Sequence, residues 1–65
     1  QRLKEPLSAR EFDFLRLLFD GRTNQQMSEE LFISINTIKT HLSRLFLKLN
    51  AGSRTEAIAR ARDLM

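Results

Sequence analysis

Three capping boxes divide this sequence into short helical segments, and they constrain its fold more than any other feature. In a capping box, the side chain of a Ser or Thr at the start of a helix accepts a hydrogen bond from the backbone N–H three residues later. The Glu or Gln at that later position accepts a hydrogen bond from the backbone N–H of the Ser or Thr. The three pairs are Ser8 with Glu11, Thr23 with Gln26, and Ser53 with Glu56. Ser34 predicts a fourth helix start, because its hydroxyl can cap the next turn while Ile33 and Ile38 form a hydrophobic staple.

Two residues that tolerate a left-handed backbone stand where helices should end. Gly21 follows the first segment and Asn50 follows the third, and both residue types are favoured at helix C-termini. Starts and ends together predict helices near residues 9–20, 24–31, 35–49 and 54–64. Strand-type alternation is absent, and the only proline, Pro6, precedes the first helix. The predicted fold is all-α, a four-helix bundle-like domain.

Length and composition set further bounds. A chain of 65 residues forms one domain, placed here at residues 1–65, and at this size folding buries only about 60 % of the unfolded surface. Because cysteine is absent, disulfides and thiolate metal sites are excluded. The longest apolar runs, such as Leu17-Leu18-Phe19, are too short for a signal peptide or a membrane span. We expect a cytoplasmic protein without membrane contact.

Positive charge is concentrated in one central segment. Residues 1–30 hold five basic and six acidic side chains, and residues 56–65 hold two of each. Between Glu30 and Glu56 there is no acid at all. The cations of this segment are Lys39, Arg44, Lys48 and Arg54. Such a block predicts a surface that meets phosphates, although an ordinary solvated helix face produces the same pattern.

The second and third predicted helices form a pair typical of DNA-binding proteins. A short helix, a turn at residues 31–34 and a long helix at about 35–49 make a helix-turn-helix, whose second member enters the major groove. On that second helix the apolar residues fall within an arc of about 100°, which predicts one buried face. They are Ile35, Ile38, Leu42, Leu45, Phe46 and Leu49.

The opposite face of this predicted recognition helix is polar and carries no acid. Short polar side chains let a helix approach base edges closely, while Lys and Arg reach guanine acceptors or phosphates. We therefore predict base contacts from Asn36, Lys39, Thr40, Ser43 and Arg44. Leu47 projects on the same side two turns further along, and we interpret it as an exposed or interface residue.

Motifs along nearly the whole chain resemble the LuxR-type DNA-binding domain. They are Leu7-Ser8-Ala9-Arg10-Glu11, Gly21, Thr23-Asn24, Ile33-Ser34-Ile35-Asn36-Thr37-Ile38-Lys39-Thr40-His41, Lys48-Leu49 and Ser53-Arg54-Thr55-Glu56-Ala57. The resemblance implies the output domain of a larger bacterial transcription regulator that binds double-stranded DNA as a homodimer. Within the family, residues 33–41 are most similar to the large ATP-dependent activators of the MalT type. RNA polymerase is the further partner expected of an activator.

The resemblance also implies roles for individual residues. It places the counterparts of Lys39, Thr40 and Ser43 at base edges. Contacts to the DNA backbone are implied for Thr23, Asn24, Gln25, Thr37, Lys48 and Arg54. Glu11 lies on the apolar face of the first helix, where it can close the capping box, pair with Lys48 or Arg54, or do both.

The last helix is predicted to turn Ala57, Ile58 and Ala61 inward. On its outer side, Ala59 is small enough to let another helix approach closely. We therefore predict a dimer interface on DNA at Ala59, Arg62 and Asp63.

No catalytic or metal site is predicted. The single histidine, His41, lies at the border of the two arcs of its helix, where a packed or phosphate-adjacent role is expected. The sequence contains neither a nucleophile with a base nor a metal-ligand set, so we predict no enzyme activity and no cofactor. A protein-interaction module that kept the fold without binding DNA is the alternative function.

Overall fold

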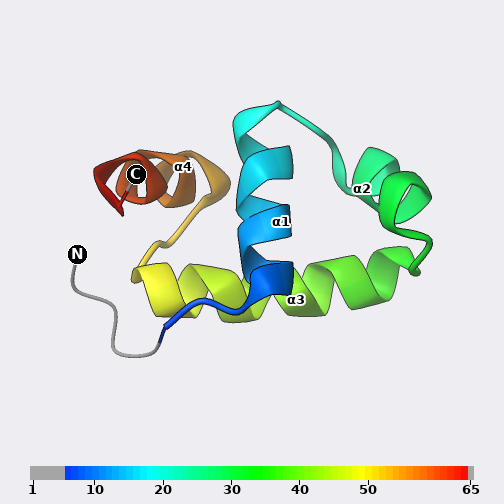
Figure 1. The fold of residues 1–65 in the computed structure, drawn as a ribbon, viewed down its shortest axis with the longest axis horizontal. Helices are drawn as coiled ribbons and strands as arrows, with labels where there is room; N and C mark the ends of the chain where they lie inside the picture. The colour runs from blue at the N-terminus through cyan, green and yellow to red at the C-terminus, as the bar shows by residue number, and fades with distance from the viewer. Residues whose placement is uncertain (1–5, 65) are drawn as a thin grey trace.

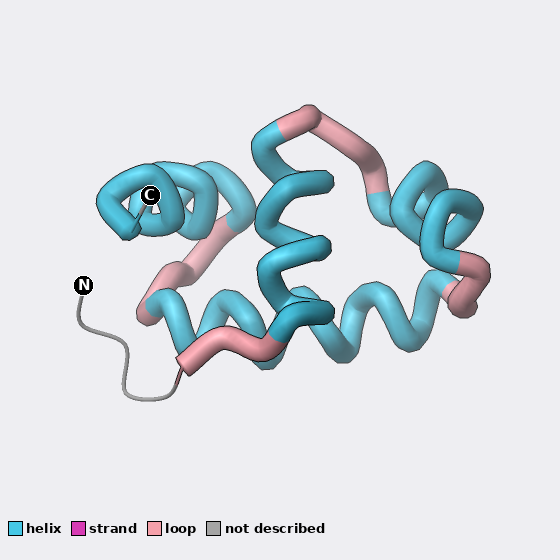
Figure 2. Tube along the Cα trace, in the orientation of Figure 1, coloured by secondary structure: helices cyan, strands magenta, loops and turns pink. Residues whose placement is uncertain are grey.

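The structure is a computed structural model that describes residues 6–64 of the chain. It contains four helices, α1 (Ala9–Phe19), α2 (Asn24–Leu31), α3 (Ile35–Leu49) and α4 (Arg54–Leu64), and no strand within the described residues (Figures 1 and 2). The all-α prediction and all four predicted helices are confirmed, and α1 ends one residue earlier than expected. The predicted domain, residues 1–65, extends beyond the described residues at both ends.

The first two predicted capping boxes form completely. The Ser8 hydroxyl oxygen accepts from the Glu11 N–H, and the Ser8 N–H donates to Glu11 Oε1 at 2.8 Å. Thr23 and Gln26 make the same reciprocal pair at the start of α2. Ser34 caps α3, as predicted, by accepting from the Thr37 N–H at 3.1 Å.

The third capping box forms only in part, which corrects the sequence prediction. Ser53 Oγ accepts from the Glu56 N–H at 3.1 Å. The Glu56 carboxylate, however, accepts from the backbone N–H of Gly52 instead of that of Ser53. The Glu56 side chain therefore caps the helix one residue further back along the chain, at the Gly52 N–H.

Three helix ends use a left-handed backbone. Gly21 and Asn50 have φ values of 77° and 56°, which confirms their predicted roles. Phe32, the C-cap of α2, also has a φ of 59°, and this conformation was not predicted. It is unusual for a bulky side chain, and the Phe32 side chain is 92 % exposed.

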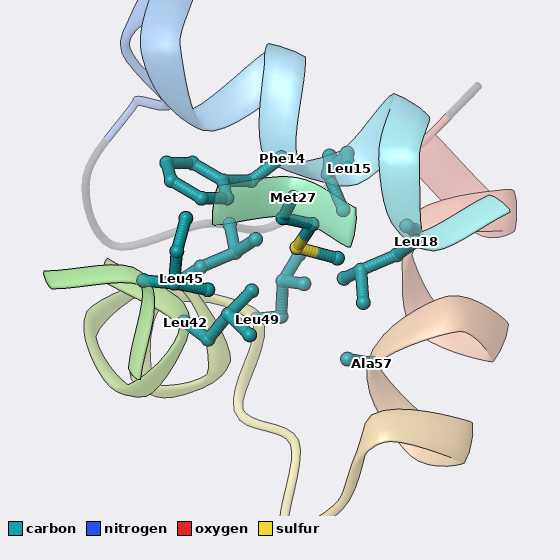
Figure 3. Packing of buried hydrophobic residues seen from close by; sticks show 10 residues of the cluster. Phe14, Leu15, Leu18, Met27, Leu42, Leu45, Leu49 and Ala57 are labelled. Atoms are coloured by element: carbon teal, nitrogen blue, oxygen red, sulfur yellow. The ribbon is translucent and has the colours of Figure 1, made fainter. Parts of the chain in front are cut away.

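The hydrophobic core lies where α1 crosses α3, with α2 and α4 on opposite sides of α1 (Figure 1). Figure 3 shows Met27 of α2 reaching between the side chains of α1 and α3. The predicted apolar arc of α3 is buried at its centre and half-buried at Ile35 and Phe46. The buried cluster is Phe14, Leu15, Leu18, Met27, Ile38, Leu42, Leu45, Leu49, Ala57 and Ala61. This packing turns the polar side of α3 away from the rest of the molecule.

Candidate nucleic-acid interface

The polar side of α3 forms one continuous exposed face. All five side chains predicted to contact bases are exposed on it, and no acidic residue occurs between Ile35 and Leu49. The residues are Asn36, Lys39, Thr40, Ser43 and Arg44. The fold therefore brings the predicted base-contacting residues together on one side of one helix, with cations among short polar side chains.

The helix orients the Thr40 hydroxyl of this face and the hydroxyl groups of Ser34 and Thr37 at its start. Thr40 Oγ1 donates to the backbone oxygen of Asn36 at 3.1 Å. Ser34 Oγ donates to Thr37 Oγ1 at 2.9 Å. Because each hydroxyl has one proton and two lone pairs, the exposed Thr40 hydroxyl can still accept a hydrogen bond. Such an acceptor matches the amino groups that bases present in the major groove.

Lys48, predicted to contact the DNA backbone, reaches back across the molecule to α1. Its Nζ donates to Glu11 Oε1 at 2.9 Å and to the carbonyl oxygen of Pro6 at 3.5 Å. The Lys48 side chain is only 23 % exposed. Of the two partners implied for Glu11, the structure shows Lys48 and not Arg54, and the capping box persists beside this ion pair.

The environment of Glu11 lowers the pKa of its carboxyl group below the ordinary value of 4.5. Burial alone would raise this pKa, but the hydrogen bond from the Ser8 N–H and the hydrogen bond and charge of Lys48 outweigh it. Glu11 is therefore held in the charged form, as an ion pair that joins the start of α1 to the end of α3.

Arg54 is likewise directed into the molecule. Its Nη1 donates to the carbonyl oxygen of Arg22 at 3.4 Å, and its Nη2 donates to Asn24 Oδ1. The central block of cations therefore divides in two. Lys39 and Arg44 are exposed on α3, whereas Lys48 and Arg54 are half-buried and bind other elements of the fold.

The remaining residues predicted to contact the DNA backbone lie at the starts of two helices. Thr23 is the exposed N-cap of α2, Thr37 is exposed in the first turn of α3, and Asn24 and Gln25 begin α2. Asn24 is half-buried and Gln25 is exposed. Gln25 Nε2 donates to Glu29 Oε2 at 3.1 Å, one turn along the helix. No acidic residue lies in the first turn of α2, so the positive end of its dipole is not neutralised there.

His41 packs against the core. Its ring stacks on Phe14 with ring centroids 5.1 Å apart and planes 26° from parallel, which agrees with the packed role expected of it. Within residues 6–64 no group of three or more potential metal ligands is found. No helix in that range is long and apolar enough to cross a membrane.

The exposed surface also includes the predicted dimer region and two strongly exposed apolar side chains, Leu47 and Phe32. Ala59, Arg62 and Asp63 are exposed on α4, as expected of an outer face. Leu47 is 79 % exposed and Phe32 is 92 % exposed. The exposure of Leu47 agrees with its interpretation. The exposure of Phe32 was not predicted, because the sequence indicates a turn at residues 31–34 but not the left-handed backbone of Phe32 within it.

A short helix, a tight turn and a longer helix with an outward, acid-free polar face define a helix-turn-helix DNA-binding domain. The chain matches the family model described as "GerE: Bacterial regulatory proteins, luxR family" over residues 5–61, and it belongs to this family. It is thus a DNA-binding domain of the kind found in transcriptional regulators.

Known relatives are much longer than this chain. It is 45 % identical over 53 residues to the transcriptional regulatory protein LiaR of Bacillus subtilis, covering 82 % of this chain and 25 % of LiaR. It is 43 % identical over 60 residues to the regulator MalT of Vibrio campbellii, covering 92 % of this chain and 7 % of MalT. The chain is therefore similar to MalT and to LiaR at nearly the same level of sequence identity.

Solved structures share the fold closely. The response regulator ChrA of a heme-sensing two-component system matches with a TM-score of 0.89 and 43 % identity, over 97 % of this chain and 31 % of ChrA. The DNA-binding domain of the response regulator ComA, solved in complex with the anti-activator RapF, matches with a TM-score of 0.85 and 40 % identity. That match covers 88 % of this chain and 98 % of the ComA domain.

Proposed function

We propose that this chain recognises a specific double-stranded DNA sequence by placing α3 in the major groove. The acid-free exposed face of α3 carries this proposal. Asn36, Lys39, Thr40, Ser43 and Arg44 read base edges, because their side chains lie on that face and supply the donors and acceptors that groove reading needs.

The surroundings of α3 position the domain on the DNA backbone. Thr23, Asn24 and Gln25 at the start of α2, and Thr37 in the first turn of α3, lie close to phosphates. Lys48 and Arg54 contribute mainly by holding α1, α2 and α4 against α3, since both are engaged within the fold. Their charge still adds to the positive potential that attracts DNA.

The complete regulator is a bacterial, cytoplasmic transcription activator that acts as a homodimer on DNA and meets RNA polymerase there. LiaR and MalT are much longer than this chain, and their length supports the proposal that the complete regulator is larger as well. The two copies meet through Ala59, Arg62 and Asp63 of α4, where the small Ala59 side chain permits close helix approach. This exposed surface offers little apolar area, so we expect the separate domain to be a monomer in solution.

The proposal is tested by selecting binding sites for this chain from a library of random duplexes. We expect enrichment of one half-site motif, and pairs of half-sites about one helical turn apart. The selected site should bind roughly 10³-fold more tightly than random DNA. Absence of both enrichment and low-salt binding would favour a protein-interaction role, of the kind that the complex of the ComA domain with RapF shows for that protein.

A further inference from the structure

Leu47 is the only apolar side chain among the exposed residues of α3. The other exposed residues of this helix are Thr37 and the five proposed base-contacting residues, and all of them are polar. Leu47 is 79 % exposed, so it contributes little to the core. The next residue, Lys48, is turned back towards Glu11 of α1. In its last turn, α3 therefore presents a leucine outward and no polar group that competes with it.

Leu47 lies in line with the polar face of α3. At about 100° per residue, it falls within roughly 40° of Asn36, Thr40 and Ser43 around the helix. Because each residue rises by about 1.5 Å, it lies roughly 10 Å beyond Thr40 along the axis. A single exposed leucine needs no explanation by itself. This one, however, continues the stripe that faces DNA, so it meets the same surface further along.

The chemistry of leucine restricts what it can recognise in DNA. Its side chain has neither a donor nor an acceptor, and the apolar group that base edges present in the major groove is the thymine methyl group. That methyl group lies on the side of the base nearest its own sugar–phosphate strand, where the end of a recognition helix leaves the groove floor. We infer that Leu47 packs against a thymine methyl group and adds a thymine preference to base reading by α3. This inference rests on the DNA binding proposed above.

The experiment replaces single thymines of the selected site by uracil, which differs from thymine only in lacking the methyl group. Fluorescence anisotropy measures binding of this chain to each substituted duplex. We expect one such replacement in each half-site to weaken binding about threefold to fivefold, because one methyl group is no longer removed from water. In Leu47→Ala the same replacement should cause no further loss, because its apolar partner is already absent.

Three variants separate this contact from folding and from general affinity. Leu47→Ala should keep its thermal stability, because the side chain is exposed and alanine favours a helix. It should bind the selected site about fivefold more weakly and random DNA almost normally. Leu47→Met keeps an apolar side chain of similar size and should retain the thymine preference. Phe32→Gly is the matched control, because it removes an exposed apolar side chain outside α3, and it should leave every uracil effect unchanged.

The outcomes distinguish this inference from the proposed function. If Leu47→Ala binds the selected site normally, or remains as sensitive to every uracil as the native chain, Leu47 contacts no thymine methyl group. If Leu47→Ala loses the same factor on random DNA, Leu47 packs against the sugar–phosphate backbone and reads no base. Either result overturns the inference while DNA binding stands. If no site is selected and no duplex binds at low salt, the proposed function itself is overturned.

Discussion

At the scale of single residues, Glu11 couples stability to pH. Its folded pKa is lowered, so its stabilising contribution is fully present above the unfolded pKa and is lost as pH falls through the folded pKa. We expect the free energy of unfolding to decline below about pH 4.5. Glu11→Gln should cost about 1–2 kcal/mol at neutral pH and reduce this acid dependence.

Chemical denaturation of the native chain and of Glu11→Gln, measured between acid and neutral pH, checks this expectation. Glu29→Gln is a suitable control, because it removes the same charge from an exposed position of α2. If Glu11→Gln and Glu29→Gln have the same stability at every pH, the ion pair with Lys48 contributes nothing.

Phe32 offers a second prediction at this scale. Its left-handed backbone is unfavourable for a side chain with a Cβ, and its 92 % exposed ring gains little from packing. Phe32→Gly should therefore raise stability by about 1 kcal/mol, because glycine adopts this conformation without steric cost. Thermal unfolding measures the change. A loss of stability would mean that the ring packs usefully within the turn.

At the scale of elements, α3 carries cations with different tasks. Lys39 is exposed on the reading face, so Lys39→Ala should lose about 1–3 kcal/mol at the selected site and little on random DNA. Lys48→Ala should instead lower folding stability, because the buried Glu11 loses its partner. Binding titrations on both DNAs, combined with thermal melts, separate the two effects. Equal losses from both variants on both DNAs would contradict base reading by the first turns of α3.

At the scale of the whole molecule, the arrangement of cations sets the salt dependence of binding. Four central cations alone would suggest a slope of log affinity against log salt near −4. Because Lys48 and Arg54 are engaged within the fold, we expect a slope of about −2 per domain on random DNA, from two exposed cations. Fluorescence anisotropy at several salt concentrations measures it. A slope of −4 or steeper would show that the partnered cations also neutralise phosphates.

Self-association is a second property of the whole molecule. The α4 face around Ala59 is small and mostly polar, so pairing should require DNA to hold two copies side by side. Analytical ultracentrifugation of the chain should find a monomer at micromolar concentration, and two copies on a duplex with two half-sites. A tight dimer without DNA would contradict this expectation.

The sequence by itself determined where the helices begin and end and which side of α3 is polar. Capping and amphipathic patterns depend on residues three or four apart, so Ser8, Ser34 and Asn50 could be interpreted without knowing the fold. The five proposed base-contacting residues follow from the same local periodicity, and the structure places them on one exposed face.

Only the tertiary structure decided what the other cations bind. Lys48 and Glu11 are 37 residues apart, and Arg54 and Asn24 are 30 apart. In the sequence, all four cations of the central block belong to one charge pattern. Which of them faces solvent depends on how α1 crosses α3 and how α4 returns to α2. A charge pattern shows how many cations lie close together along the sequence. Their partners depend on distances between helices, and these are fixed only once the helices pack together.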